Sequence, residues 1–165
     1  MWHPRSMSSL LPKRAGNKSL RKGRRSLAGQ IYHVTARAHS NTKPFANAEF
    51  ANAACAAFHA TSRVVDVTLL AWVLMPDHAH WLIEIGDRSN VSAVIGRLKS
   101  SAAGAMNQLT DAPKGQSVWQ AGFYDRAIRS DEDVLTVARY VVANPLRAGL
   151  VTRLCDYPWW NSVWL

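Results

Sequence analysis

The feature that most constrains the fold is a pair of apolar segments separated by two turn-forming residues. Residues 64–75 (VVDVTLLAWVLM) are rich in β-branched and aliphatic side chains, and residues 78–85 (HAHWLIEI) form a second such run. Pro76 and Asp77 lie between them, and both residue types favour turns. The pattern predicts two strands joined as a hairpin, the first of them central in a sheet.

The segment before this hairpin predicts another strand and a helix. Residues 30–37 (QIYHVTAR) alternate, so that Tyr32, Val34 and Ala36 share one side and His33, Thr35 and Arg37 share the other. Alternation of this kind is typical of a half-buried strand, and residues 47–63 have the Ala-rich, helically spaced pattern of a helix.

The segment after the hairpin predicts helices on both sides of a short extended region. Asn90 is a suitable N-cap for a helix that runs to residue 109, and residues 118–128 contain short extended pieces. A third helix is expected to start at Ser130, which forms a capping-box pattern with Asp133, and to end before Pro145. The order β-α-β-β-α-β-α favours an α+β fold, a ferredoxin-like sandwich with helices packed on an antiparallel sheet.

Charge divides the chain into two parts. The 165 residues suffice for one compact domain, and the net charge is +9. We expect residues 1–29 to form a basic arm and residues 30–165 to form the folded domain, which is nearly neutral. Such an arm favours contact with nucleic acid over a merely solvated tail, and Pro12, Gly16 and Gly23 disfavour a transit-peptide helix. The residues nominated for DNA contact in this arm are Arg14, Lys18, Arg21, Lys22, Arg24 and Arg25.

Composition also argues against several classes of protein. No apolar run approaches the ~20 residues of a membrane span, so no membrane partner is expected, and no secretory signal is evident. Cys55 and Cys155 lie far apart, which excludes a disulfide scaffold or a cysteine-rich zinc module and fits a reducing cytosol.

His78 and His80 are the first candidate functional residues. Their i, i+2 spacing on a predicted strand places both imidazoles on one face, where they can chelate a divalent ion. Spacing alone also fits two surface or hydrogen-bonded histidines. Their position directly after a turn, on a rigid hairpin, strengthens the interpretation as metal ligands.

Tyr140 and Asn144 are the second candidate pair. The apolar residues of the third helix share one arc of the helical wheel, and Tyr140 lies outside it, one turn before Asn144. The alternative is an amphipathic tyrosine at the helix edge and an asparagine that ends the helix. Tyr124, near Arg126 and Arg129, is the second-choice nucleophile, whereas Tyr32 and Tyr157 are expected to pack.

Several motifs together resemble a known family. YHVTAR (32–37), WVLMPDHAHWLIE (72–84), WQAGFYDRAIRSDED (119–133), ARYVVANPLRAGLV (138–151) and YPWW (157–160) occur in the order typical of REP-associated tyrosine transposases. These are bacterial relatives of the single-tyrosine HUH transposases, and the resemblance extends over roughly residues 24–162. It implies an HUH-endonuclease type of fold.

The resemblance assigns roles to individual residues. It implies that His78 and His80 hold Mg²⁺ or Mn²⁺, with Ala79 as the hydrophobic middle residue of the HUH motif. Tyr140 matches the nucleophile, and Asn144 occupies the place of a third ligand. The implied reaction is cleavage of single-stranded DNA through a 5′-phosphotyrosine intermediate that leaves a free 3′-OH.

The resemblance also implies a substrate and a setting. The family acts on repetitive extragenic palindromic (REP) DNA hairpins, so the expected partner is such a hairpin and the expected location is the bacterial cytoplasm, at the nucleoid. A monomer is expected, although the wider superfamily forms dimers with swapped helices. Arg126 and Arg129 are additional candidate DNA contacts near the active site.

Other functions stay open at this point. The main alternative is a hairpin-binding protein that does not cut; a conjugative nickase would need a larger chain, and RNA binding by the arm is the residual option. The C-terminal tryptophans at positions 159, 160 and 164 can stack on unpaired bases, but packing against the sheet is the commoner role.

Overall fold

The structure, a computed structural model, describes residues 27–110, 117–129 and 132–164. The strands are β1 (Ile31–Arg37), β2 (Val67–Met75), β3 (His78–Ile85), β4 (Tyr124–Ala127) and β5 (Trp160–Ser162). The α-helices are α1 (Ala48–Ser62), α2 (Val91–Asn107), α3 (Val134–Val142) and α4 (Asn144–Arg147). Short 3₁₀ turns cover His39–Asn41, Pro44–Ala46 and Leu154–Asp156.

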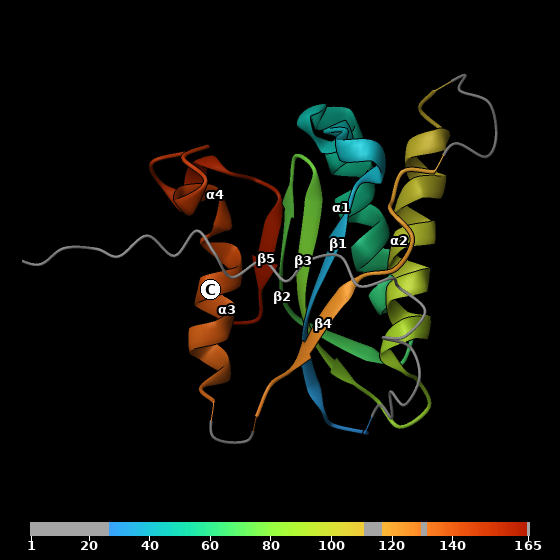
Figure 1. Cartoon of the computed structure of the whole chain (residues 1–165), viewed down its shortest axis with the longest axis vertical. Helices are drawn as coiled ribbons and strands as arrows, with labels where there is room; N and C mark the ends of the chain where they lie inside the picture. The colour runs from blue at the N-terminus through green and yellow to red at the C-terminus, as the bar shows by residue number, and fades with distance from the viewer. Residues whose placement is uncertain (1–26, 111–116, 130–131, 165) are drawn as a thin grey trace, which may run out of the picture.

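The strands form one antiparallel sheet (Figure 1). Its order is β4-β1-β3-β2-β5, and the predicted hairpin of β2 and β3 lies in it with β3 at the centre. The first four positions reproduce the ferredoxin-like arrangement expected from the β-α-β-β-α-β order. The predicted α+β sandwich is therefore confirmed, with β5 as an added strand beside β2.

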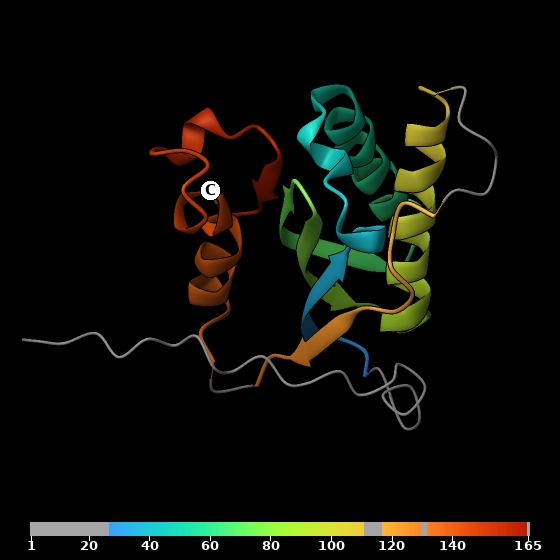
Figure 2. The same cartoon turned by 45° about the horizontal axis from the view of Figure 1, so that its top comes forward.

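Helices cover both faces of the sheet. Figures 1 and 2 show α1 and α2 side by side on one face and α3 with α4 on the other. The strand alternation decides which side chains meet which layer: Tyr32, Val34 and Ala36 of β1 are buried in the core under α1 and α2. His33 and Thr35 point the opposite way, toward the layer that contains α3.

Polar side chains cap the starts of α1, α2 and α3. The Asn47 side chain accepts hydrogen bonds from the first turn of α1, and Asn90 does the same for α2, as expected. The prediction for α3 was wrong at its start, because the helix begins at Val134 and Asp133 is its N-cap, accepting from the Leu135 amide. Ser130 lies outside the described residues.

The remaining differences from the sequence prediction are local. Residues 64–66 form a turn rather than the start of β2. α3 ends at Val142, and Asn144 begins the separate short helix α4, which has Pro145 in its first turn. Tyr32 and Tyr157 are buried, which confirms that both pack.

The C-terminal tryptophans fit the packing interpretation. Trp160 lies in β5 opposite Val73 of β2, and Trp159 packs on the core while its indole N–H donates to Asn52 Oδ1 at 2.9 Å. Trp164 is exposed.

Two class-level expectations can also be compared with the structure. Within the described ranges, no helix is long and apolar enough to cross a membrane. Cys55 and Cys155 are free thiols, consistent with the absence of a disulfide framework.

Candidate active site

The two candidate metal ligands converge on one point. His78 and His80 alternate with the fully buried Ala79 on β3, so both imidazoles leave the same face of the sheet. Their Nε2 atoms lie 3.1 Å apart. Two nitrogens that bind one octahedral ion at ~2.1 Å and at right angles lie ~3.0 Å apart. The pair therefore fits two adjacent ligands of a divalent cation.

Outer contacts orient both imidazoles for this purpose. His78 Nδ1 donates to Asp77 Oδ1 at 2.5 Å. His80 Nδ1 lies 2.9 Å from Thr35 Oγ1 and 3.1 Å from His33 Nε2. We assign the ring proton to Nδ1 in each case, because a carboxylate, hydroxyl or imidazole behind a ligating histidine selects this tautomer. Both Nε2 lone pairs then face the same space.

Asp77, Thr35 and His33 were not predicted as site residues. The available signals were the Asp77 position directly before His78 and the alternation that placed His33 and Thr35 on one face of β1. Their contribution depends on strand register: Thr35 lies opposite His80 and Arg37 opposite His78. Because His33 contacts Nδ1 of His80, it lies behind that ring and acts as its support.

Burial keeps the imidazoles of His80 and His33 neutral. It lowers the pKa of His80 to about 2, helped by the charges of His78, His33, Arg147 and Arg37. Burial also lowers the pKa of His33 to about 4, with smaller contributions from Arg126 and Arg147. A neutral imidazole has the lone pair that a metal requires, so neutrality at pH 7 suits ligation.

Tyr140 points away from the core, as the helical wheel predicted. Its side chain is 56% exposed, whereas the adjacent Val141 is buried in a cluster with Val73 and Met75 of β2. Those two residues are the cross-strand partners of His80 and His78. The end of α3 that carries Tyr140 is thus packed beside the strand positions that pair with the histidines.

Asn144 and Arg147 form a polar corner with Tyr140. The Asn144 amide donates to the Val141 carbonyl at 2.7 Å, and Asn144 Oδ1 accepts from Arg147 Nη2 at 2.8 Å. The Arg147 guanidinium carbon lies 3.7 Å from the centre of the Tyr140 ring. The Asn144 side chain therefore caps a carbonyl at the end of α3 and lies one turn after Tyr140, and its role as a metal ligand stays a prediction.

Tyr124 also lies on the histidine face. It is 61% exposed on β4 and pairs with Thr35 of β1, which in turn pairs with His80. Tyr124 and His80 are therefore two strands apart in one cross-strand row. This placement keeps Tyr124 as the comparison residue for Tyr140.

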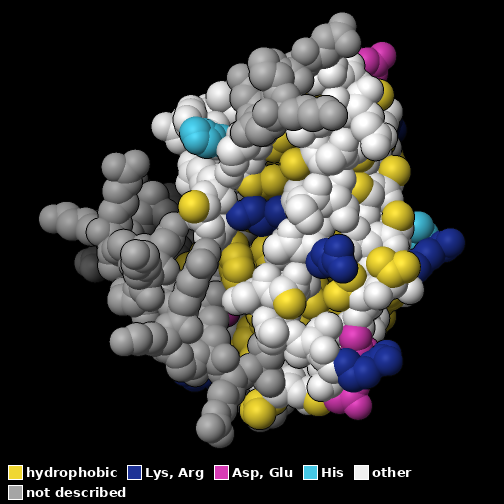
Figure 3. All heavy atoms as spheres, turned by 90° about the vertical axis from the view of Figure 1, so that its right-hand side faces the viewer, with side chains coloured by type: hydrophobic (Ala, Val, Ile, Leu, Met, Phe, Trp, Pro, Cys, Tyr) yellow, Lys and Arg dark blue, Asp and Glu magenta, His cyan; other side chains and the backbone are white. Residues whose placement is uncertain are grey.

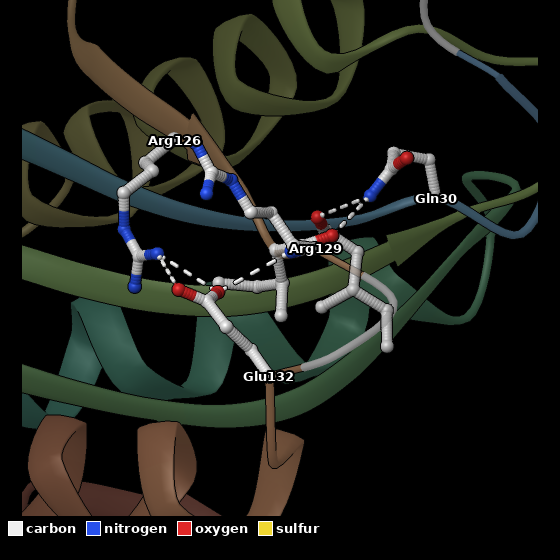
Figure 4. A network of polar contacts seen from close by, with 6 residues as sticks. Gln30, Arg126, Arg129 and Glu132 are labelled. Atoms are coloured by element: carbon white, nitrogen blue, oxygen red, sulfur yellow. Dashed lines mark hydrogen bonds and ion pairs between the residues drawn. The ribbon is translucent and has the colours of Figure 1, made fainter.

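Arg126, one of the residues predicted to contact DNA, forms an ion pair with Glu132. Arg126 Nη1 donates to both carboxylate oxygens of Glu132, at 2.6 and 2.8 Å, and the Arg129 amide also donates to Glu132 (Figure 4). Gln30 Nε2 donates to the Ile128 carbonyl at 2.8 Å and so holds the same stretch to the start of β1. DNA contact by Arg126 and Arg129 stays a prediction, and the nominated arm residues lie outside the described residues.

The described cations are arranged differently on the two sides of the molecule. Arg37, Arg126 and Arg147 come from three separate elements, and the charge of each acts on His80 or His33. On the face that contains α2, the described Lys and Arg side chains are scattered, and one group of them lies beside Asp or Glu side chains (Figure 3). The histidine face is therefore the better candidate for binding a polyanion.

Two relatives of this chain are named as transposases. The REP-associated tyrosine transposase of Escherichia coli (strain K12) is 31% identical over 90 residues, which cover 53% of this chain and 50% of that protein. A putative REP-associated tyrosine transposase of Haemophilus influenzae is 24% identical over 139 residues, covering 79% and 78%. The chain thus spans half the length of the first relative and most of the second. These matches confirm the resemblance to REP-associated tyrosine transposases.

Solved structures share the fold. A REP-associated tyrosine transposase solved with a REP hairpin superposes with a TM-score of 0.66 at 20% identity, over 83% of this chain and 79% of that one. A putative transposase from Deinococcus radiodurans R1 gives a TM-score of 0.54 at 18% identity, over 73% and 94%. The family model described as "Transposase IS200 like" matches residues 26–144. The chain belongs to this family of IS200-like transposases.

Proposed function

We propose that the protein is a metal-dependent single-strand DNA endonuclease and strand transferase that acts on REP-type hairpins. The observation that carries the proposal is the pair of Nε2 atoms of His78 and His80, 3.1 Å apart on one face of β3. The exposed Tyr140 on the neighbouring α3 supplies a nucleophile, and family membership supports DNA as the substrate.

His78 and His80 would hold Mg²⁺ or Mn²⁺, with Asn144 Oδ1 as a third ligand after it leaves Arg147. Such an ion would polarise the scissile phosphate and neutralise charge that develops on it. Within the described residues, no group of three or more His, Cys, Asp or Glu side chains is arranged to hold a metal. A set of two imidazoles and one amide oxygen leaves positions free for phosphate oxygens and water.

Tyr140 carries the covalent step. Its phenol oxygen attacks the phosphorus, an O–P bond forms, and the P–O3′ bond breaks. The phenol proton goes to water or to the departing 3′ oxygen, which becomes a free 3′-OH. The resulting 5′-phosphotyrosine retains the phosphodiester linkage energy, so a 3′-OH can later attack it and rejoin the strand without ATP.

A hairpin substrate is supported by the relatives and by charge. One solved structural neighbour is a REP-associated transposase bound to a REP hairpin. In our proposal residues 1–29 form a DNA-binding arm with eight basic and no acidic residues before the catalytic domain of residues 30–165, and Arg126 and Arg129 contribute near the site. A chromosomal hairpin as substrate places this activity in the bacterial cytoplasm.

We propose that Tyr140 serves the histidines of its own chain in a monomer. Arg147 supports this arrangement, because it stacks on Tyr140 while its charge acts on His80 of the same chain.

The decisive test is a cleavage assay with end-labelled single-stranded REP hairpins from the genome that encodes this chain. The full-length protein is incubated with Mn²⁺, Mg²⁺ or EDTA, and products are separated on a denaturing protein gel. We expect labelled DNA to migrate with the protein when either ion is present and not with EDTA. Tight hairpin binding without any adduct would instead establish the non-cutting alternative, and a preference for RNA of equal length would exclude both.

A further inference from the structure

Arg147 connects the nucleophile, the proposed third ligand and the histidines. Its Nη1 donates to the Tyr140 carbonyl at 2.7 Å and its Nη2 donates to Asn144 Oδ1 at 2.8 Å. The guanidinium plane also covers the Tyr140 ring, with the central carbon 3.7 Å from the ring centre. One planar group therefore fixes both the ring and the only atom of Asn144 that can bind a cation.

Arg147 differs from Arg126 and Arg153 in having no carboxylate partner among the described residues. Arg126 pairs with Glu132, and Arg153 pairs with Asp156. In the described segments, no carboxylate lies within ion-pair distance of Arg147, whose recorded contacts are two oxygen acceptors and an aromatic face. Such neutral partners can be exchanged for an anion, because a bidentate phosphate contact is stronger than a hydrogen bond to a neutral oxygen.

The location of this uncompensated charge points to the same anion. After burial, the positive charge of Arg147 is among the causes of the lowered pKa of His80 and of His33. Arg147 is therefore close enough to influence His80 and His33 electrostatically. A cation at the histidines would add to this positive charge, and a bound phosphodiester would balance both.

We propose that Arg147 is a positioning residue that clamps Tyr140 and Asn144 in the free protein and moves onto a DNA phosphate when the strand binds. The inference deepens the proposed function and rests on it for the identity of the anion. The same two N–H groups that hold the Tyr140 carbonyl and Asn144 Oδ1 would then donate to two phosphate oxygens. Release of Asn144 Oδ1 makes that atom available to the cation, so binding of DNA and completion of the ligand set are linked.

The clamp can be tested without cleavage. The full-length protein is labelled with ¹³C-tyrosine, and the Tyr140 ring signals are assigned with Tyr140→Phe. We expect Arg147→Ala to shift these signals in the free protein, and we expect a REP-type hairpin, added to the wild type in EDTA, to shift them as well. Arg153→Ala is the matched control, because it removes an arginine that pairs with Asp156 and should leave the Tyr140 signals unchanged.

These signals decide each half of the proposal. Tyr140 signals that are insensitive to Arg147→Ala overturn the clamp, provided that the variant keeps the melting temperature of the wild type; Arg147→Gln provides the same comparison if the alanine variant does not fold. A hairpin that fails to bind, or binds without moving the Tyr140 signals, overturns the transfer to phosphate. Absence of adduct from the wild type contradicts only the proposed function, because the signals do not depend on cleavage.

A second measurement separates charge from geometry. In single-turnover assays at saturating DNA, we expect Arg147→Ala to slow adduct formation at least ~100-fold, in the range of other groups that stabilise a reacting phosphate. The salt dependence of hairpin binding should fall by about one counterion. Arg147→Lys should restore the salt dependence but not the rate, because an ammonium lacks the planar fork that holds two oxygens while it covers the ring. Full recovery of the rate by lysine would show that charge alone matters and overturn the positioning role.

Discussion

The two faces of the sheet are built from the same strands, but one carries the main apolar core and the other carries the histidines of the candidate site. On one face, the 15-residue α1 and the 17-residue α2 cover the sheet, and large side chains such as Phe58, Trp72 and Trp81 fill the space between them. On the other face, the nine-residue α3 buries only a short apolar stripe. The polar side chains of β1 and β3 lie beside that stripe, nearest the hairpin turn.

The difference shows how a rigid site is obtained from a strand. Trp81 of β3 is fully buried under α1 and α2. Its neighbour His80 faces the other way, where its Nε2 lies beside that of His78. Each histidine is therefore fixed by the packing of the residues beside it, with little backbone freedom left to lose on binding. The face under α1 and α2 contributes most of the buried apolar core. On the other face, the nine-residue α3 leaves His78 and His80 partly exposed.

The largest effect is expected on the active face. Tyr140→Phe should abolish the covalent adduct and leave hairpin binding within ~3-fold, because only the nucleophilic hydroxyl is lost. Tyr124→Phe is the matched control, since it removes a hydroxyl from an equally exposed tyrosine on the same face. Adduct formed by Tyr140→Phe but not by Tyr124→Phe would reassign the nucleophile to Tyr124.

Mixing two inactive variants tests whether the site is complete within one chain. His78→Ala should also abolish cleavage and should weaken Mn²⁺ binding in calorimetry, because one of two converging imidazoles is gone. A mixture of His78→Ala and Tyr140→Phe should remain inactive in a monomer. Recovery of adduct in the mixture would show that Tyr140 attacks at the histidines of a second chain.

The opposite face should respond in stability. Phe58 is fully buried and its ring meets Trp72 and Trp81 edge-on at 5.7 and 5.1 Å. Phe58→Ala should lower the free energy of unfolding by ~3–5 kcal/mol, the usual result of emptying an aromatic core position. Urea unfolding measures the change, and Leu109→Ala at an exposed position should stay within ~0.5 kcal/mol. Equal effects of the two variants would contradict the assignment of this face as the main core.

Acid should destabilise the protein through the active face. The folded-state pKa values of His33 and His80 are about 4 and about 2, below their ordinary value of 6.5. Between pH 6.5 and 4 the unfolded chain therefore binds protons that the folded chain does not, and stability falls as the pH falls. From pH 7 to pH 5.5 we expect a loss of about 2–3 kcal/mol for the two histidines together in EDTA.

Urea unfolding of histidine variants at several pH values shows which histidines cause this pH dependence of stability. His33→Gln should remove about half of the loss, as expected when one of two similar groups no longer titrates. His59→Gln on the exposed side of α1 should keep all of it. A pH dependence that survives unchanged in His33→Gln would place the titrating groups elsewhere.

The support behind His78 should be measurable in metal affinity. Asp77→Asn replaces the carboxylate that accepts the His78 Nδ1 proton by a neutral amide of the same shape. Mn²⁺ affinity should fall ~10–100-fold, as for other carboxylates behind ligating histidines. Asp87→Asn provides a control on an exposed carboxylate. Unchanged Mn²⁺ affinity in Asp77→Asn would show that the contact does not orient the ligand.

Local sequence pattern predicted the secondary-structure elements and the direction of their side chains, but it did not predict the contacts between elements. The hairpin, the convergent His78 and His80, and the outward Tyr140 follow from periods of two and of 3.6 residues, which the sequence displays directly. The supports of His80 depend on the register of β1 against β3, which is set by contacts over the whole sheet. The contact of Arg147 with Tyr140 crosses the break between α3 and α4, where helical spacing no longer applies.

Short elements were the other source of difference. The three residues of β5 are extended because they pair with β2, and three residues are too few to show alternation. At the start of α3, several residues that can cap a helix follow one another within residues 130–133, and the structure has Asp133 as the cap, accepting from the Leu135 amide. Neither choice could be made from local sequence alone.

The smallest effect is expected where the C-terminal segment joins the two faces. The buried Tyr157 hydroxyl donates to the Leu74 carbonyl of β2 at 2.7 Å, beside the strand positions opposite the histidines. Burial raises the pKa of Tyr157 to about 12, so the hydroxyl remains a donor over the range in which the protein is handled. Tyr157→Phe should lower the free energy of unfolding by ~1 kcal/mol in urea, because a buried carbonyl loses its partner while the ring keeps its packing. Adduct formation should be unchanged, and a large loss of activity would show that this bond holds β2, and with it the histidine face, in its active geometry.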